Sequence, residues 1–578
     1  MKSFEFECLN VKTENELIKE SLEKISEGEV SIYKLSLELK ENTIPKPYEL
    51  SFFEKQIDII GYYSSKSYLN HNITPDWHMR ENESKTASGT PLMSFYSKMG
   101  INQLTISLSD AKTPIKISAG VVEENGKLHI KIRIFDSLSS KISKYETLIR
   151  IDRRKIPLYD IVPDTRSWWG SLGNNTAYVP DNARLPMYST WYSFHQNTIP
   201  DEIIKECEIA KEYGMDSVIV DDGWQTEDNS RGYAYCGDWQ ISKQKIPDMK
   251  CFVDKIHSLG MKFIIWFSVP FVGYKSKNFE RFKGMYLYDN KNMNACVLDP
   301  RFGEVREFLI DTYISYVKKY GWDGLKLDFI DSFRLSEESS TEYEKMDTVS
   351  VEDALEMLLS ELDIKLKEIN PEFLIEFRQS YIGPVICKYG NMLRVGDCPN
   401  DALMNRVGSI SLRLTSDKIP VHSDMLMWNY EDTDESVMSQ LLSIMFSVPQ
   451  ISVRLSGLSD SHKTLLMEFL NFWRRNREII LDGKLSFEGI YANYTMVKSE
   501  KNGQSVVVLY QSTDYSLRED KANVFNITDK DYIIVDTMCK YDYTCYDMYG
   551  NIEGGGKIQK GVSKISLKNA SRVEFNKL

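Results

Sequence analysis

The stretch Gly324-Leu-Lys-Leu-Asp-Phe-Ile-Asp331 decides the fold. Its side chains alternate as in a β-strand, with Leu325, Leu327 and Phe329 on one face and Lys326 and Asp328 on the other. Burying a cation and a carboxylate together is costly unless their face opens into a polar pocket. In such a pocket Lys326 would keep Asp328 ionised, and an ionised aspartate on a rigid strand can act as a nucleophile. A structural ion pair at the strand end is an equally good interpretation of this stretch alone.

Size, charge and cysteine usage narrow the class of protein. A chain of 578 residues is too long for one core, so two to four domains are expected. The net charge of −13 argues against a nucleic-acid or membrane-surface partner. We expect no signal peptide at the start of the chain and no membrane span, because no apolar run approaches about 18 residues. Nine scattered cysteines without zinc-finger spacing favour reduced thiols in a cytoplasmic protein.

Residues 1–178 are predicted to form an N-terminal β-sandwich. Leu128–Phe135 alternates apolar and polar residues as a half-buried strand does. Further short strands are predicted at Val30–Leu39, Gln103–Ser109 and Ile115–Val122. The polar stretch 70–91 is predicted to be a long loop; its Asp76-Trp77-His78 could lean over a site elsewhere, although an ordinary surface loop is favoured.

Strand-like and helix-like segments alternate through residues 179–485, as in a (β/α)₈ barrel. The candidate strands are Leu185–Trp191, Asp216–Asp222, Met261–Phe267, Gly324–Phe329, Glu372–Arg378, Met392–Gly396, Ile419–His422 and Gln450–Val453. The clearest helices are Asp201–Glu212, Asp248–Leu259, Glu304–Lys319 and Val351–Ile369, each ending at or near a Gly or Pro or at a polar turn.

Residues 486–578 lack helical patterns and predict a small C-terminal antiparallel β domain. Its strands are expected at Val506–Tyr510, Tyr532–Val535, Thr544–Met548 and Lys564–Leu567, with Glu553-Gly-Gly-Gly556 in a turn-rich joint. The predicted fold is thus a TIM barrel between two β-sandwiches.

Polar and aromatic side chains gather at the carboxyl ends of the predicted barrel strands, where such barrels carry their sites. These residues are Trp191, Asp221, Asp222, Trp266, Lys326, Asp328, Arg378, Arg394, Asp397, His422 and Asp424. Each has an ordinary structural explanation, such as a helix cap for Asp221 and Asp222, a loop hydrogen bond between His422 and Asp424, or barrel filling by tryptophan. A run of them at successive strand ends is much less expected by chance.

This mixture suits a sugar, because carboxylates and arginine bind hydroxyls and aromatic rings cover the apolar face of the ring. Two carboxylates also suffice to cleave a glycosidic bond without a metal or a cofactor. Asp328 would attack the anomeric carbon, and Asp397 would protonate the leaving oxygen and then deprotonate water. Asp397 would need a raised pKa, which the charge of Asp328 would favour and Arg394 would oppose.

Several motifs resemble glycoside hydrolase family 36, which shares a clan with families 27 and 31. They are Val220-Asp-Asp-Gly-Trp224, Gly237-Asp-Trp239 with Ile246-Pro247, Lys255–Phe263 with Trp266-Phe267, Val297-Leu-Asp-Pro300, Gly324–Phe329, Leu455-Ser-Gly-Leu458 and Phe472–Arg477, within about residues 185–485. The resemblance implies an exo-acting, retaining α-galactosidase with Asp328 as nucleophile and Asp397 as acid/base. It also implies that Asp221 and Asp222 hold the 4- and 6-hydroxyls of galactose and that Lys326 and Trp191 contact the sugar.

Two departures from the family pattern leave alternatives open. Ser268-Val-Pro-Phe271 replaces an acidic continuation after strand three. Phe377-Arg-Gln-Ser380 is closer to the loop of family 31 whose arginine contacts the sugar 2-hydroxyl. We therefore keep an α-N-acetylgalactosaminidase, a transglycosylase like the raffinose synthases, and a catalytically inactive carbohydrate-binding barrel as alternatives. The expected partner is a carbohydrate substrate, and a homo-oligomer stays open.

Overall fold

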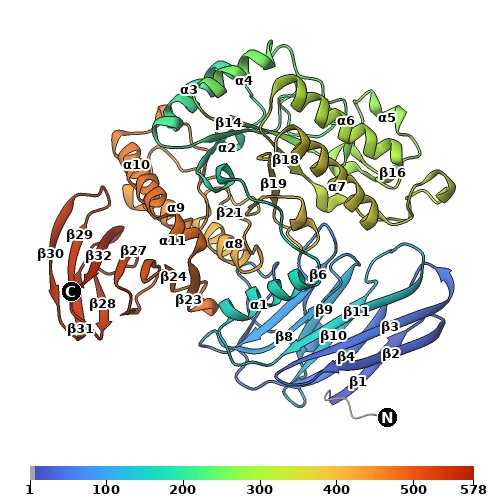
Figure 1. Ribbon diagram of the computed structural model, residues 1–578, viewed down its shortest axis with the longest axis horizontal. Coiled ribbons are helices and arrows are strands. Elements are labelled where there is room, and N and C mark those ends of the chain that lie inside the picture. The colour runs from blue at the N-terminus through green and yellow to red at the C-terminus, as the bar shows by residue number, and fades with distance from the viewer. Residues whose placement is uncertain (1–6) are drawn as a thin grey trace.

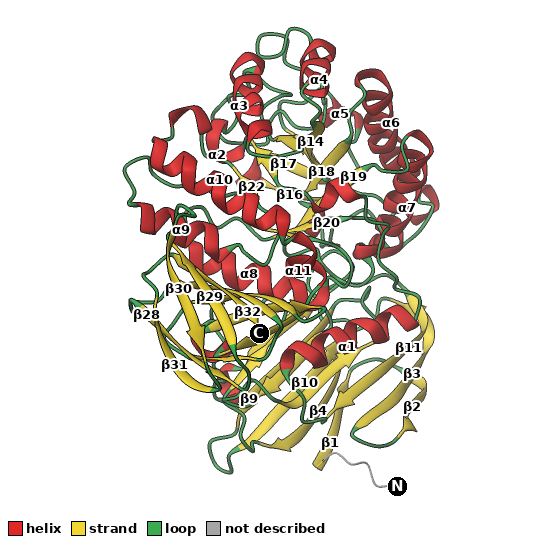
Figure 2. Ribbon diagram, turned by 60° about the vertical axis from the view of Figure 1, so that its left-hand side comes forward, coloured by secondary structure: helices red, strands yellow, loops and turns green. Residues whose placement is uncertain are grey.

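The computed structural model describes residues 7–578 as three bodies in chain order (Figure 1). A β-sandwich, drawn in blue, precedes a barrel that runs from green to orange, and a red β domain follows. Figure 2 shows that the helices surround the strands of the barrel, whereas the two flanking bodies consist mainly of strands. The predicted fold class is confirmed. Within residues 7–578, no helix is both long enough and apolar enough to cross a lipid bilayer.

The N-terminal sandwich packs two sheets on one core. One sheet has the order β1 (Glu7–Thr13), β4 (Tyr48–Lys55), β10 (Lys127–Ile134), β9 (Ile115–Val121) and β6 (Arg80–Ser84). The other has the order β2 (Leu17–Ser26), β3 (Val30–Thr43), β11 (Ile142–Asp152), β8 (Asn102–Leu108), β7 (Leu92–Tyr96) and β5 (Gly61–Tyr63). The alternation of β10 buries Leu128, Ile130 and Ile132 in this core, which explains why the sandwich was predictable.

The prediction of one long loop over residues 70–91 is wrong in part. Its second half contains β6, which pairs with β9 along its whole length and so satisfies its backbone groups. The segment Asp76–His78 forms a 3₁₀ turn on the surface. Trp77 is 74% exposed, and its indole N–H donates to Glu123 of the same domain. It therefore belongs to an ordinary surface turn, as the favoured interpretation expected.

All eight predicted barrel strands are present and run parallel. In sheet order they are β22 (Gln450–Ile451), β12 (Met187–Ser189), β13 (Ser217–Val220), β14 (Lys262–Ser268), β18 (Gly324–Asp328), β19 (Leu374–Arg378), β20 (Met392–Arg394) and β21 (Val421–His422). Isolated bridges from His422 to Val448 and from Leu426 to Ile451 bring the two edges together. A small antiparallel sheet that the sequence patterns did not suggest follows β14: β15 (Phe271–Gly273), β16 (Tyr286–Asn290) and β17 (Ala295–Leu298).

Several barrel helices begin or end at recognisable capping residues. Ser350 accepts a hydrogen bond from the Asp353 N–H at the start of α7, and Gly321 ends α6 in the left-handed conformation. The helices are α1 (Leu158–Ser171), α2 (Trp191–Phe194), α3 (Pro200–Glu212), α4 (Met249–Ser258), α5 (Asn278–Arg281), α6 (Gly303–Tyr320), α7 (Val351–Ile369), α8 (Ala402–Thr415), α9 (Asp434–Ser443), α10 (Asp460–Arg475) and α11 (Arg477–Asp482).

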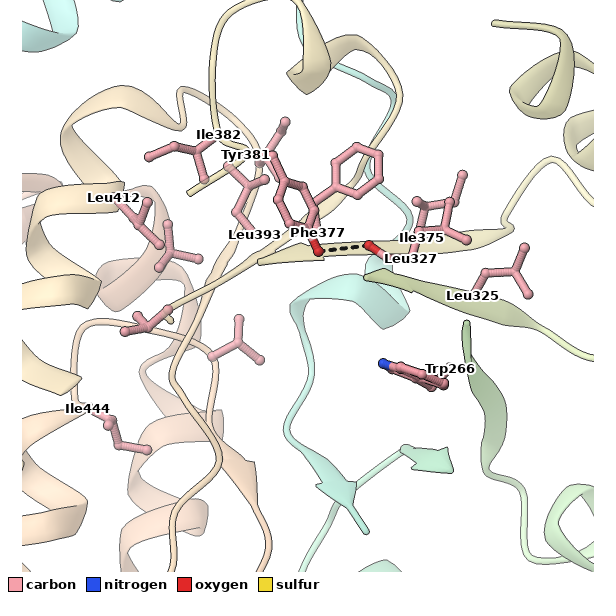
Figure 3. Close-up of a cluster of buried hydrophobic side chains, with 14 of the residues drawn as sticks. Trp266, Leu325, Leu327, Ile375, Phe377, Tyr381, Ile382, Leu393, Leu412 and Ile444 are labelled. Carbon is pink, nitrogen blue, oxygen red and sulfur yellow. Dashed lines mark hydrogen bonds between the residues drawn. The ribbon is translucent and has the colours of Figure 1, made fainter. Parts of the chain in front are cut away.

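The apolar face of β18 anchors the strand in the largest core. Leu325 and Leu327 are fully buried among residues of β19 and β20, as Figure 3 shows. The Tyr381 hydroxyl donates to the Leu327 carbonyl at 2.8 Å, which ties the segment after β19 to the end of β18. This packing fixes the opposite face of β18, with Lys326 and Asp328, toward the barrel interior.

The C-terminal body packs a seven-stranded sheet against a three-stranded one. The larger sheet has the order β23 (Lys484–Glu488), β24 (Met496–Lys501), β25 (Gln504–Leu509), β27 (Lys521–Asn526), β32 (Ser571–Lys577), β29 (Tyr541–Tyr546) and β30 (Ile552–Ile558), and the smaller has β26 (Asp514–Leu517), β28 (Tyr532–Thr537) and β31 (Gly561–Ser566). The turn predicted at Glu553–Gly556 is wrong, because these residues lie inside β30. Their glycines leave room for the Tyr543 side chain of β29, which lies 3.1 Å from where a Cβ of Gly556 would be.

Candidate active site

Nine of the eleven predicted site residues line one cavity at the carboxyl end of the barrel strands. They are Trp191, Asp221, Asp222, Trp266, Lys326, Asp328, Arg378, Arg394 and Asp397. They come from six consecutive strands of the barrel or from the residues directly after them. The parallel strands bring these ends together although the residues span more than 200 positions of sequence.

Asp328 lies at the base of this cavity with its two oxygens in different surroundings. Oδ1 accepts hydrogen bonds from Arg378 Nε at 2.5 Å and from the Phe329 N–H at 2.8 Å. Oδ2 accepts one from the indole N–H of Trp266 at 3.0 Å. Burial opposes ionisation, but the charges of Arg378 and then Lys326 outweigh it and hold the pKa of Asp328 well below its usual range. Asp328 is therefore an ionised carboxylate at neutral pH.

Lys326 helps to keep Asp328 ionised, as predicted, although its direct partner is another carboxylate. Lys326 Nζ lies 2.5 Å from Asp221 Oδ2, and both side chains are almost completely buried. Lys326 acts on Asp328 only through space, whereas Arg378 binds it directly. β13 and β18 both pair with β14, and the two registers bring the residue after Val220 level with Trp266 and thus with Lys326.

Asp222 is held by two glutamine side chains. Gln196 Nε2 and Gln225 Nε2 donate to its oxygens at 2.7 and 2.6 Å. Burial raises the pKa of Asp222 to about 6, partly offset by these hydrogen bonds. The next residue, Gly223, has a φ of 117°, and a Cβ there would lie 2.5 Å from Gln196 Cα. The glycine thus permits the turn that brings Gln196 against Asp222. No helix follows directly, so Asp221 and Asp222 are not helix caps.

Asp397 lies at the mouth of the cavity, with 55% of its side chain exposed. Its Oδ1 is 2.9 Å from Arg394 Nη2. Partial burial and the charge of Asp328 raise the pKa of Asp397. The charges of Arg394 and Lys326 lower it by a larger amount. The net pKa is below the usual value, so the predicted raised pKa is wrong for the sugar-free protein: the adjacent arginine outweighs the nucleophile's charge.

His422 and Asp424 do not line the cavity. His422 is fully buried; its Nε2 lies 2.8 Å from the Ala183 carbonyl, and burial lowers its pKa to about 4. Asp424 uses one oxygen for Arg394 Nη1 at 2.6 Å and the other for the Cys398 N–H and the Tyr192 hydroxyl. Asp424 thus binds Arg394 from outside the cavity and orients its guanidinium group. The predicted substrate contacts of these two residues are therefore corrected, since every polar group they offer is directed at the protein.

Two aromatic residues of the cavity were missed as site residues. Tyr233 lines it from the long segment after β13, where no strand-end pattern marks it. Phe329 was assigned to the apolar face of the strand, but it lies just past the end of β18 with a φ of 64°, and this left-handed turn directs it into the cavity. The two rings meet edge to face at 4.9 Å.

The N-terminal sandwich supports the segment that carries Arg378. The Gly89 N–H donates to the Ser380 carbonyl at 2.7 Å, and Lys85 Nζ donates to the carbonyls of Asp331 and Phe333. Asp331, the last residue of the quoted stretch, lies 3.8 Å from Arg378 Nη2, whereas Asp328 accepts from Arg378 Nε. Arg378 is thus fixed between two carboxylates and by a contact from another domain.

Across the described chain, residues 7–578, no three His, Cys, Asp or Glu side chains are grouped so that they could hold a metal ion. The cavity lining offers carboxylates, cations and aromatic rings. Among its four carboxylates, Asp328 is buried and Asp397 is exposed at the mouth.

Part of the chain is similar in sequence to known α-galactosidases. The family model described as Melibiase matches residues 181–381. The α-galactosidase Mel36A of Lactobacillus acidophilus is 26% identical over 159 residues, which cover 26% of this chain and 20% of that protein. An Escherichia coli α-galactosidase is 35% identical over 89 residues, 15% of this chain and 12% of the other. The matched segments thus span a fifth or less of these curated relatives.

The solved structures extend the likeness to the whole chain. The family 36 α-galactosidase AgaA of Geobacillus stearothermophilus, crystallised with raffinose, superimposes with a TM-score of 0.65 at 12% identity and covers 99% of this chain and 87% of its own. An α-galactosidase of Lactobacillus brevis gives 0.64 at 13% identity, with 99% and 85% covered. The chain thus resembles α-galactosidases in part of its sequence and family 36 α-galactosidases in its fold. At such low identity these superpositions establish the shared three-domain fold alone.

The segment matched by the family model ends at Tyr381. It includes the cavity residues from Trp191 to Arg378 and leaves out Arg394 and Asp397. The sequence match therefore covers the residues at the base of the cavity. It does not reach Asp397 at the mouth.

Proposed function

We propose that the protein is an exo-acting glycoside hydrolase that releases a terminal α-linked galactose or galactose-like sugar. The observation that carries the proposal is the pair of carboxylates on one cavity: Asp328 is ionised and buried at the base, and Asp397 is half exposed at the mouth. The curated relatives are named α-galactosidases, which supports galactose as the sugar.

The surroundings of Asp328 favour attack through Oδ2. Oδ1 is engaged by Arg378 and by the Phe329 N–H, whereas Oδ2 has only the Trp266 indole and keeps a lone pair for the sugar. In the first step Oδ2 bonds to the anomeric carbon, the glycosidic bond breaks, and its oxygen takes the proton of Asp397. In the second step Asp397 removes a proton from water, which displaces Asp328. Two inversions give retention of configuration.

The pKa of Asp397 has to change during this cycle. In the sugar-free protein Arg394 keeps it low. A bound sugar removes water from its exposed side chain, which raises the pKa and favours the protonated acid. Once Asp328 has become an uncharged ester, its negative charge no longer raises the pKa of Asp397. The carboxylate form then suits the role of base in the second step.

The polar walls of the cavity fit the hydroxyls of one hexose. We assign the 4- and 6-hydroxyls to Asp221, Asp222 and Lys326, and the 2-hydroxyl to Arg378. Arg394 positions Asp397, and Trp191 and Trp266 cover the apolar face of the ring. Since Arg378 also binds Asp328, its contact with the 2-position would couple recognition of that hydroxyl to the nucleophile.

The sugar is identified with aryl α-glycosides of galactose, N-acetylgalactosamine and glucose. We expect turnover of the galactoside to exceed that of the other two by at least about a hundredfold. The equatorial 4-hydroxyl of the glucoside would leave buried Asp222 and the Asp221–Lys326 pair without their partner. The N-acetylgalactosaminide lacks the 2-hydroxyl that is assigned to Arg378. Preference for the N-acetylgalactosaminide would show that the cavity beside Arg378 has space for an acetamido group at the 2-position. Equal, slow turnover of all three would contradict the proposal.

Asp222 predicts the acid side of the pH profile. Its raised pKa of about 6 means that the carboxylate is lost as the pH falls through 6. We expect kcat/KM for the galactoside to fall about tenfold per pH unit below that point, because the protonated group accepts sugar hydroxyls poorly. The Asp222→Asn variant should be slower, and its kcat/KM should no longer fall below pH 6. If the fall persists unchanged in the variant, another titrating group causes it.

Transfer to a second sugar is the alternative that the structure favours among those considered. Asp397 is open to solvent at the mouth, so an acceptor hydroxyl could approach it in place of water. Product analysis at high sugar concentration separates the two reactions. We keep a cytoplasmic location and a homo-oligomer as proposals, and an inactive carbohydrate-binding barrel is excluded if the galactoside is turned over.

A further inference from the structure

A buried carboxylate beside the catalytic cavity plays no part in the proposed double displacement. Asp424 follows β21, its side chain is 0% exposed, and it does not line the cavity. Its Oδ1 accepts a hydrogen bond from Arg394 Nη1 at 2.6 Å. Its Oδ2 accepts from the Cys398 N–H at 2.6 Å and from the Tyr192 hydroxyl at 2.9 Å. Asp424 thus binds both the cation that pairs with Asp397 and the peptide N–H that follows Asp397.

The backbone of Asp424 is held by the helix that follows Asp397. The Asp424 N–H donates to Asn405 Oδ1 at 2.9 Å, and Asn405 Nδ2 donates to the Asp424 carbonyl at 3.0 Å. Asn405 lies near the start of α8. The segment that carries Asp397 is therefore tied to Asp424 at Cys398 and again at Asn405. These contacts hold the carboxylates of Asp397 and Asp424 in a fixed arrangement around Arg394.

Arg394 is shared among three carboxylates. Its Nη1 faces Asp424 Oδ1 at 2.6 Å, its Nη2 faces Asp397 Oδ1 at 2.9 Å, and its Nε lies 3.5 Å from Glu376 Oε1. The contact with Asp424 is the shortest of the three. Each carboxylate offsets part of the positive field of the guanidinium, and the nearest one offsets most. Asp424 therefore weakens the hold of Arg394 on Asp397.

The surroundings of Asp424 favour its carboxylate form. Burial raises its pKa, Arg394 lowers it, and the charge of Asp397 raises it again. The guanidinium and the peptide N–H can only donate, and one of them faces each oxygen, so both oxygens act as acceptors. The repulsion between Asp424 and Asp397 is mutual. The charge of Asp424 therefore also raises the pKa of Asp397.

The other charged and titratable groups around Asp397 come from several elements. They are Lys326 and Asp328 of β18, Arg378 of β19, Arg394 of β20, Tyr192 of α2 and the adjoining Cys398. The three cations favour the ionised form of Asp397, and Asp328 opposes it. The tyrosine and the cysteine are neutral, because burial raises the pKa of each. Asp424 adds a negative charge that is hydrogen-bonded to the nearest of the three cations.

We propose that Asp424 is the positioning residue of the acid/base: by holding Arg394, it leaves Asp397 able to carry the proton that the leaving oxygen takes. The inference rests on the proposed function, in which Asp397 is the acid. Without the charge of Asp424, Arg394 would act more strongly on Asp397 and keep it ionised down to a lower pH. The first step would then lack its proton over more of the pH range.

The test is the pH dependence of kcat for phenyl α-galactoside at saturating concentration. Phenoxide is a poor leaving group, so the first step needs the proton of Asp397, and kcat falls on the alkaline side as the sugar-bound acid ionises. Asp424→Asn should move the midpoint of this fall down by about one pH unit, which lowers kcat about tenfold above both midpoints. A midpoint within about a third of a pH unit of wild type would overturn the proposal.

Dinitrophenyl α-galactoside separates this effect from general damage to the site. Its leaving group departs without a proton, so the burst of dinitrophenol reports a first step that does not depend on Asp397 as an acid. Asp424→Asn should change the burst rate by less than about threefold over the same pH range. An equal loss with both substrates would show structural damage instead of a changed proton affinity, and would also overturn the proposal.

Three further variants assign the shift. Tyr192→Phe removes a donor from the same carboxylate but keeps its charge, so the midpoint should move by less than about a third of a pH unit. If Asp424→Asn does not fold, Asp424→Ser also removes the charge, can still accept from the Cys398 N–H, and should give the same downward shift. Asp397→Ala should abolish the alkaline fall. A fall that persists in Asp397→Ala would overturn the acid/base assignment itself. A fall that is lost there but unmoved in Asp424→Asn would overturn the role of Asp424 alone.

Discussion

Replacement of Asp328 by alanine is expected to lower kcat for an aryl α-galactoside by roughly 10⁴- to 10⁶-fold, the range found when a hydrolase loses its nucleophile. The variant lacks the oxygen that would bond to the anomeric carbon, and Arg378 loses its direct partner. Initial rates with wild-type and variant protein measure the effect, and circular dichroism checks the fold. Turnover within about tenfold of wild type would reject the assignment.

Azide rescue distinguishes the nucleophile from the acid/base. In the Asp328→Ala variant, azide can occupy the space of the lost carboxylate and attack from the same side, which gives the β-galactosyl azide. In Asp397→Ala, azide attacks the ester formed on Asp328 from the other side and gives the α-azide. Proton NMR of the products identifies the anomer. The reverse assignment of products would exchange the two roles.

Asp331 provides the matched control for Asp328. It is also a carboxylate near Arg378, at 3.8 Å, but it does not line the cavity. We expect Asp331→Ala to lower kcat by less than about tenfold, because Arg378 keeps its bond to Asp328. A loss as large as that of Asp328→Ala would mean that the position of Arg378, not the nucleophile alone, limits the rate.

Replacement of Lys326 by methionine is expected to lower the free energy of unfolding by about 3–5 kcal/mol, as when one member of a buried ion pair is removed. Asp221 would remain as an unpaired carboxylate that is 2% exposed. Urea denaturation of wild type and variant measures the change. Galactoside turnover should also fall strongly, since the pair is assigned to the sugar hydroxyls.

A double variant separates the structural role of this pair from its role in binding. Asp221→Asn combined with Lys326→Met removes both charges, so the stability loss should be smaller than the sum of the single losses. Activity should stay low, because the hydroxyl partners are still missing. Lys250→Met is the surface control: it breaks an ion pair with Asp254 whose side chains are both more than half exposed, and should cost less than about 1 kcal/mol. Full additivity in the double variant would show that Lys326 and Asp221 do not stabilise each other.

Much of the fold was predictable because it follows from local patterns. The eight barrel strands, the helices between them and the alternating strand β10 are each marked by short-range periodicity and by capping residues. The misplaced segments have specific causes. β6 is polar and was taken for a loop, and the glycines of β30 were taken for a turn although they make room for Tyr543.

Nine cavity residues were predictable for a related reason: parallel strands bring their carboxyl ends together whatever the details of packing. Phe329 shows the limit of this rule. A strand pattern places Phe329 with Leu327 in the core. The chain leaves the strand in a left-handed turn at this residue, so the ring points into the cavity instead. The alternation of faces holds only while the strand continues.

The sequence by itself determined which residues reach the strand ends and which strands surround the cavity. Only the tertiary structure decided how the charges pair: Arg378 with Asp328, Lys326 with Asp221, and Arg394 with both Asp397 and Asp424. It also directed His422 into the barrel interior. The physical reason is that charge pairing and pKa depend on distances of a few ångströms between side chains from different strands, and the register and twist that set those distances are properties of the whole barrel.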